Sequence, residues 1–168
     1  MSTHFFAHVS RTHGLILLAV RYRTLCPVGP PLDTQWLNAP EFAQSSKKLG
    51  IGKFMMIIKT WANSWSTSDR YHEETRLPCI MGCQCFVSCE DDAKDVLAHY
   101  LECPILWTVI NSAALTLQRP QEGSAECRAC LCNPTLNDFK RLVVAFNVYH
   151  SLRLGHRTVV ASATRSCK

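Results

Sequence analysis

Four side chains in the middle of the chain have the types and the spacing of a zinc site. Cys79 and Cys83 are separated by three residues, and Gly82 directly precedes the second cysteine. His99 and Cys103 are four residues apart, so both side chains leave the same face if this segment is a helix. Zinc prefers four tetrahedral thiolate or imidazole ligands, and glycine tolerates the left-handed backbone that a tight ligand turn needs. The sequence therefore predicts a zinc site of these four residues, with binding coupled to local folding.

The chain has ten cysteines, so other ligand assignments stay open. Cys85 and Cys89 lie in the same loop, and Cys85 could take the place of Cys83; we prefer Cys83 because of the glycine before it. A second group comprises Cys127, Cys130 and Cys132, with His150 and His156 as the nearest additional donors. Its spacing fits half of a metal site, but no clear second pair follows, and free thiols in a loop are the better interpretation.

Helices are expected on both sides of the cysteine-rich loop. Apolar residues recur at three- and four-residue steps over 45–66, which predicts an amphipathic helix with a solvated basic face; a helix laid on a phosphate backbone is the alternative. A second helix should begin near Glu90-Asp91-Asp92, where acidic side chains suit the positive end of the helix dipole, and run towards Pro104. Pro104 could open a further apolar helix over 105–117. A last helix is expected over 136–154.

These elements divide the chain into three segments. Residues 1–44 are expected to be irregular or a linker, because Cys26–Pro31 is rich in proline and glycine, although 15–22 could form a short strand. Residues 45–118 would contain the first helix, the zinc loop and the second helix. Residues 119–168 would contain a loop and a C-terminal helix with a frayed tail. The predicted fold is mainly α, a small helical domain around a Cys-Cys-His-Cys zinc knuckle.

Composition limits the partners more than it identifies them. The chain has 168 residues, 47% of them apolar, which suits one ordinary domain with a core. Its formal net charge of +5 permits a polyanionic partner without requiring one. The apolar run Leu15–Val20 is too short to cross a bilayer and has no signal-peptide cleavage site after it. We therefore expect no membrane partner and a reduced, intracellular protein, with the nucleus as one candidate compartment; the oligomeric state is not indicated.

Three motifs between residues 61 and 107 resemble one known family. They are Trp61-Ala-Asn-Ser-Trp65-Ser-Thr-Ser68-Asp-Arg70-Tyr-His72, Leu77-Pro-Cys79-Ile-Met-Gly-Cys83 and His99-Tyr-Leu-Glu-Cys103-Pro-Ile-Leu-Trp107. Together they resemble the C-terminal zinc-binding region of non-LTR (LINE-type) retrotransposon reverse transcriptases. The versions found as open reading frames in protist genomes, those of dinoflagellates especially, are the most similar. The resemblance covers about residues 55–110 of the chain.

The resemblance implies a zinc-stabilised accessory module that helps a reverse transcriptase hold RNA or DNA. The implied Zn²⁺ ligands are Cys79, Cys83, His99 and Cys103. Basic side chains near the site would contact phosphates and aromatic side chains would stack on bases. The residues expected in these roles are Arg70, Arg76, Lys94, Trp65 and Tyr71.

The same resemblance implies limits on what the chain does alone. The fingers and palm of the polymerase, its catalytic aspartate pair and a nuclease carboxylate set are missing from the sequence, so we expect no enzymatic activity and a fragment or decayed copy. A hydrolytic zinc enzyme is disfavoured, because zinc sites with several cysteine ligands are mostly closed to water. The alternative function is a zinc-stapled protein-interaction domain with no nucleic-acid role.

Overall fold

The structure, a computed structural model, describes residues 13–25, 32–68, 70–72, 77–83, 94–113 and 124–166. Its helices are α2 (His13–Leu25), the 3-10 helix η1 (Gln35–Asn38), α3 (Pro40–Leu49), α4 (Ile51–Trp61), α6 (Leu97–Glu102), α7 (Pro104–Ala113), α8 (Ala125–Arg128) and α9 (Leu136–Ser166). In these ranges the β-structure amounts to an isolated antiparallel bridge between Pro78 and Lys94. The prediction of a mainly helical fold is confirmed.

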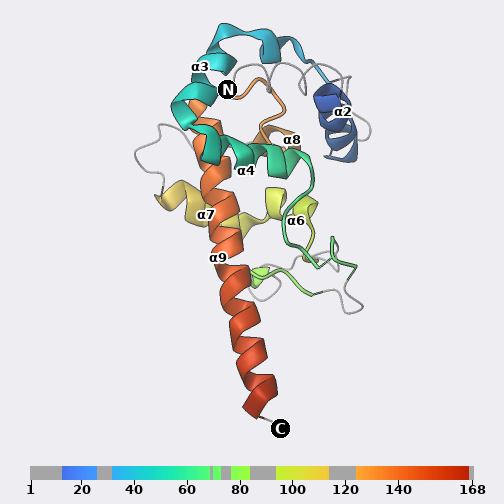
Figure 1. Cartoon of the computed structure of the whole chain (residues 1–168), viewed down its shortest axis with the longest axis vertical. Helices are drawn as coiled ribbons and strands as arrows, with labels where there is room; N and C mark the ends of the chain where they lie inside the picture. The colour runs from blue at the N-terminus through green and yellow to red at the C-terminus, as the bar shows by residue number, and fades with distance from the viewer. Residues whose placement is uncertain are drawn as a thin grey trace.

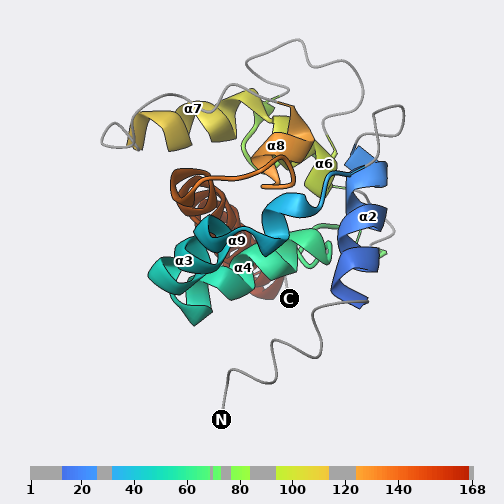
Figure 2. The ribbon, with the colours of Figure 1, turned by 90° about the horizontal axis from the view of Figure 1, so that it is seen from above.

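Helix α9 runs through the middle of the molecule, and α3, α4 and α7 pack against it, whereas α2 packs against α4 and α8 (Figure 1). Helices α3 and α4 contact α9 on one side and α7 on another, as the view from above shows (Figure 2). Its C-terminal half extends beyond the other helices (Figure 1). None of the helices in the described part of the chain combines the length and the apolar character needed to cross a membrane.

The start of α9 is specified by a local capping interaction. The Thr135 hydroxyl accepts a hydrogen bond from the Asp138 backbone N–H at 3.3 Å, and the Asp138 carboxylate accepts one from the Thr135 backbone N–H at 2.9 Å. This reciprocal pair satisfies N–H groups that a helix start leaves without partners. The predicted start at Leu136 is confirmed, whereas the helix continues past the predicted end at Leu154 to Ser166.

The predicted helix over 45–66 is two helices, which is a correction. Helix α3 ends and α4 begins at Gly50, whose backbone angles are φ 81° and ψ 153°. Glycine is essentially the only residue that adopts this conformation, and it breaks the helix at Gly50. The apolar pattern of the sequence continues across the break, which is why one helix was predicted. Helix α4 then ends at Trp61, before Trp65.

The N-terminal segment also differs from the prediction. Residues 13–25 form a helix, where the sequence suggested irregular chain with a short strand. Leu18 and Tyr22, four residues apart, are both buried, and the Arg21 guanidinium Nε donates to the Trp61 carbonyl at 3.2 Å. Burial on one helix face outweighs the β-propensity of the run, because tertiary contacts override local preference. Residues 1–12 and 26–31 lie outside the described ranges.

The second predicted helix is shorter than expected and is followed by the expected third. Helix α6 begins at Leu97 rather than near Glu90, and residues 84–93 lie outside the described ranges. Pro104 is the first residue of α7, as predicted, since proline at this position loses no helical hydrogen bond.

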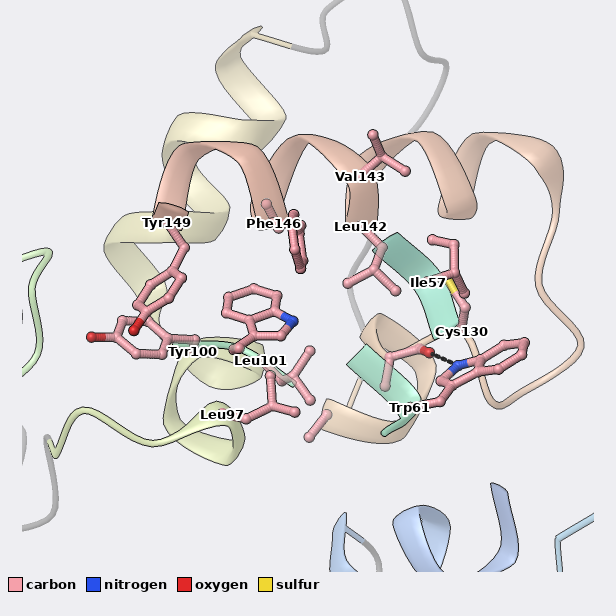
Figure 3. Packing of buried hydrophobic residues seen from close by; sticks show 14 of the residues in the cluster. Ile57, Trp61, Leu97, Tyr100, Leu101, Cys130, Leu142, Val143, Phe146 and Tyr149 are labelled. Atoms are coloured by element: carbon pink, nitrogen blue, oxygen red, sulfur yellow. Dashed lines mark hydrogen bonds between the residues drawn. The ribbon is translucent and has the colours of Figure 1, made fainter. Parts of the chain in front are cut away.

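The core is rich in aromatic rings that meet between α4, α6 and α9 (Figure 3). Trp65 packs against both Tyr100 and Tyr149, with ring centroids 6.1 and 5.0 Å away, and the two tyrosine rings contact each other at 4.6 Å. The indole Nε1 of Trp65 donates to the Thr60 hydroxyl at 2.9 Å. The indole of Trp61 donates to the Ala129 carbonyl at 2.8 Å, the bond drawn in Figure 3. Both indole N–H groups are therefore satisfied inside the core.

The break at Gly50 gives a test with a matched control. Gly50→Ala should lower the free energy of unfolding by about 1–3 kcal/mol, because alanine is strained at this φ although no atom lies within 4 Å of the added Cβ. Gly52→Ala has the same open surroundings in helical backbone and should raise that free energy by about 0.4–1 kcal/mol. Urea unfolding of both variants measures the difference; equal effects would contradict a conformational role for Gly50.

Candidate metal centre

The four predicted ligands meet at one point of the structure. The ligand atoms of Cys79, Cys83, His99 and Cys103 all lie within 4.8 Å of one another. Cys79 and Cys83 come from the loop 77–83, His99 from α6, and Cys103 from the junction of α6 and α7. The three cysteines are 0–3% exposed and His99 is half-buried. Among the residues that the structure describes, these four make the one group of histidine, cysteine or acidic side chains placed to hold a metal.

The loop half of the cluster is a tight turn that presents N–H groups to sulfur. Gly82 has φ 68°, and its N–H donates to the Cys79 carbonyl at 2.9 Å. The backbone N–H groups of Met81 and Cys83 donate to the Cys79 sulfur and lower the pKa of that thiol. The turn thus favours a thiolate, the form of cysteine that binds metals. The left-handed backbone predicted at Gly82 is confirmed.

The helical half is divided between two helices. His99 lies in α6, which ends at Glu102, so Cys103 stands between α6 and α7 rather than on the same helix. The hydrogen bond to Cys79 and burial raise the pKa of Cys103. The Leu106 backbone N–H, in the first turn of α7, donates to the Cys103 sulfur and lowers that pKa by a smaller amount. A thiolate here would face the positive end of the α7 dipole. The four-residue spacing brings the two side chains together, although the helix ends between them.

Distances within the cluster fit a tetrahedral ion. The sulfurs of Cys79 and Cys103 are 3.9 Å apart, and the Cys83 sulfur is 3.3 Å from Nε2 of His99. Zinc–ligand bonds of about 2.3 Å to sulfur and 2.0 Å to nitrogen place tetrahedral S···S and S···N pairs about 3.8 and 3.5 Å apart. A single ion of that size could therefore contact all four donors with only small side-chain movements.

The sulfurs of Cys79 and Cys103 lie within hydrogen-bond distance of each other. This contact is the main cause that lowers the pKa of Cys79 and raises the pKa of Cys103. Burial acts against both thiolates. A divalent cation would displace the remaining protons, because it stabilises all three thiolates at once. The donor set and its burial fit a closed, structural metal site.

A buried carboxylate beside the cluster was not found from the sequence. Asp95 is 1% exposed and accepts hydrogen bonds from the Tyr100 and Tyr149 hydroxyls, at 2.7 and 3.1 Å. Its other oxygen accepts from the Ser68 N–H and pairs with the Arg153 guanidinium at 3.4 Å. An aspartate two residues before an apolar helix start is a weak signal, because aspartate is also common at solvent-exposed helix caps.

The predicted nucleic-acid contacts lie in different environments. Arg70 is exposed and donates to the Asn63 carbonyl and, at 3.2 Å, to the Ser64 hydroxyl. Tyr71 is 53% exposed, and Lys94 is half-buried in the bridge to Pro78. Arg76 lies outside the described ranges.

The assignment of Trp65 to base stacking is wrong. Its side chain is 1% exposed, and its ring packs against the rings of Tyr100, Tyr149 and Phe146, the last at 5.8 Å between centroids. A ring in this position cannot receive a nucleobase without loss of the core around it. The tryptophan in the motif that resembles the retrotransposon family is a packing residue in this chain.

The second cysteine group is not assembled like the first. Cys130 is fully buried, and burial raises its pKa, whereas Cys127 is half-buried and Cys132 is exposed. The His150 ring stacks on Phe146 with centroids 3.9 Å apart, and its Nδ1 is 2.9 Å from the Phe146 carbonyl. The described part of the chain therefore gives no metal role to these residues. Cys85, Cys89 and the His156 side chain lie outside it.

Three comparisons with known proteins identify no relative. No protein family, no curated protein and no solved structure matches this chain significantly. The site is therefore interpreted from its own geometry.

The choice between Cys83 and Cys85 as the fourth ligand can be tested directly. Cys83→Ser should weaken zinc binding by more than about 100-fold, since loss of a ligand exceeds the 10–100-fold cost of losing an outer-shell partner. Cys85→Ser, the matched control, should bind zinc as the parent does. Competition with a chromophoric chelator measures both affinities; the opposite ranking would assign Cys85 to the site.

Proposed function

We propose that this chain is a zinc-stabilised accessory module of a retrotransposon reverse-transcriptase protein, and that it binds RNA or DNA without polymerase activity of its own. The observation that carries the proposal is the buried cluster of three sulfurs and one imidazole within 4.8 Å. Its residues are those that the resemblance to the LINE-type zinc-binding region implies as ligands. Zn²⁺ is the proposed ion, because tetrahedral sites of this donor composition are typical of structural zinc.

The metal would act by joining elements that have few other connections. The loop 77–83 is joined to residues 94–95 by the bridge from Pro78 to Lys94 and by a hydrogen bond from the Asp95 N–H to the Leu77 carbonyl at 2.9 Å, and within it only Cys83 has a helical backbone. An ion bound by Cys79, Cys83, His99 and Cys103 would fasten this loop to the junction of α6 and α7. Binding free energy at such a site contributes directly to folding.

Three features support a nucleic-acid partner. The formal net charge is +5, which favours encounter with a polyanion. Arg70 and Tyr71 are exposed neighbours, so a phosphate and a base of a single strand could contact them together. Lys94 belongs to the bridge that borders the cysteine loop, so metal binding and the position of this lysine are linked through the backbone.

Metal removal should unfold the region around the loop. The parent is expected to bind one zinc ion in native mass spectrometry, and a His99→Ala, Cys103→Ser variant none. Chelation of the parent should lower its melting temperature, while the chelator should leave the variant unchanged. Cys132→Ser serves as a control, since this exposed cysteine is outside the cluster. A folded, reduced parent without zinc would refute the metal site.

Nucleic-acid binding should depend on salt and on the residues near the site. Fluorescence anisotropy with single-stranded RNA and DNA at 25–200 mM salt gives the slope of the logarithm of the binding constant against the logarithm of the salt concentration. In an Arg70→Ala, Arg76→Ala, Lys94→Ala variant the magnitude of this slope should fall by about 2, because each lost phosphate contact changes it by about 0.7. A Lys47→Ala, Lys48→Ala, Lys53→Ala variant removes the same charge from exposed positions on α3 and α4 and should keep the parent slope.

Other outcomes of that titration distinguish the alternatives. Loss of binding in the α3–α4 variant alone would move the contact surface to those helices. A zinc-loaded parent that binds neither nucleic acid at low salt would exclude the nucleic-acid role and favour a zinc-stapled protein-interaction domain.

A further inference from the structure

The hydroxyl of Tyr100 connects the metal loop to the buried carboxylate of Asp95. Its oxygen accepts a hydrogen bond from the Ile80 backbone N–H at 3.0 Å and donates its own proton to Oδ1 of Asp95 at 2.7 Å. Ile80 directly follows Cys79, so this N–H belongs to the turn that presents the Cys79 sulfur. The hydroxyl is therefore satisfied both as an acceptor and as a donor, and its orientation is fixed by these two bonds.

The carboxylate that orients Tyr100 is itself held from several elements. The Ser68 N–H at 2.6 Å, the Tyr149 hydroxyl at 3.1 Å and the Arg153 guanidinium at 3.4 Å all reach it. Figure 3 shows Tyr149 extending from α9 towards the ring of Tyr100. Asp95 therefore has little freedom to move, and the Tyr100 hydroxyl has a fixed acceptor.

We propose that Tyr100, oriented by Asp95, is a positioning residue for the metal site: it fixes the Cys79 turn and thereby sets metal affinity without touching the ion. The inference rests on the proposed zinc site. The positioning role of Tyr100, which directly follows His99, is not indicated by the spacing of the four ligand residues. Groups in this position commonly raise metal affinity 10–100-fold, because they hold the ligands in the bound geometry before the ion arrives.

Two conservative variants separate positioning from general stability. Tyr100→Phe removes the bonds to both Ile80 and Asp95, whereas Tyr149→Phe removes a hydroxyl from the same Asp95 oxygen and leaves the Ile80 bond in place. Both rings stay in the core, and both tyrosines are fully buried. Tyr149→Phe is therefore a matched control for the loss of one buried hydrogen bond.

The experiment measures zinc affinity by chelator competition, hydrogen exchange of the Ile80 amide in the zinc-loaded protein, and the absorption spectrum of the Co²⁺-substituted protein. Tyr100→Phe should weaken zinc binding at least tenfold, speed exchange at Ile80 and shift the cobalt bands. Tyr149→Phe should change zinc affinity less than threefold and leave the exchange rate and the bands unchanged. Asp95→Asn should also weaken zinc binding, through the lost orientation of Tyr100.

The possible failures are distinguishable. A folded parent that binds no zinc would overturn the metal site and this proposal with it. Zinc binding by the parent with equal losses in Tyr100→Phe and Tyr149→Phe would overturn only the positioning role. If Tyr100→Phe does not fold, the zinc affinity and the exchange rate at Ile80 are measured in Asp95→Asn instead. Values equal to those of the parent would overturn the positioning role of Tyr100.

Discussion

The buried ion pair of Asp95 and Arg153 is the constraint around which the rest of the structure is arranged. Both side chains are almost without solvent exposure, and removal of a carboxylate from water costs several kcal/mol unless partners replace the water. The partners are Ser68, which precedes the loop 77–83, Tyr100 on α6, and Tyr149 and Arg153 on α9. Any arrangement of loop, α6 and α9 that left this carboxylate unpaired would be disfavoured, so the group selects one packing of these elements.

The cysteine cluster also buries groups that can carry negative charge, and its sulfurs need compensation as the Asp95 carboxylate does. Three thiols at 0–3% exposure can carry negative charge only if N–H groups, a shared proton or a cation compensate it. The chain itself provides N–H groups at Cys79 and at the start of α7, and the Cys79 and Cys103 sulfurs are close enough to share a proton. The distances within the cluster fit a cation. The Tyr100 hydroxyl joins the Asp95 carboxylate to the Ile80 N–H of the cysteine turn, and the Asp95 N–H also donates to the Leu77 carbonyl, so the positions of the two buried groups are linked.

Local signals in the sequence predicted the cysteine–histidine cluster and several helix ends, but they failed where burial against distant segments decides the structure. Cys79, Cys83, His99 and Cys103 were predicted from their spacing, Pro104 from the preference of proline for the first helical position, and the start near Leu136 from the apolar residues that follow a loop, because these features are set within a few residues. The helix at His13–Leu25 forms because Leu18 and Tyr22 meet a core built from distant segments. Trp65 was misassigned for the same reason, since its neighbours Tyr100 and Tyr149 come from other helices. The importance of Asp95 depends on Arg153, which no local pattern connects to it.

Contacts on either side of residues 84–93 have a consequence for how this region can vary. The Pro78–Lys94 bridge and the bond from the Asp95 N–H to the Leu77 carbonyl connect the chain on the two sides of this segment, and the cluster of Cys79, Cys83, His99 and Cys103 brings the same two sides together. The entropy of closing a chain segment whose ends are held grows only with the logarithm of its length, and doubling the length costs about 0.6 kcal/mol. A change in the number of residues between these two sides should therefore cost little folding free energy compared with the loss of a contact that joins them.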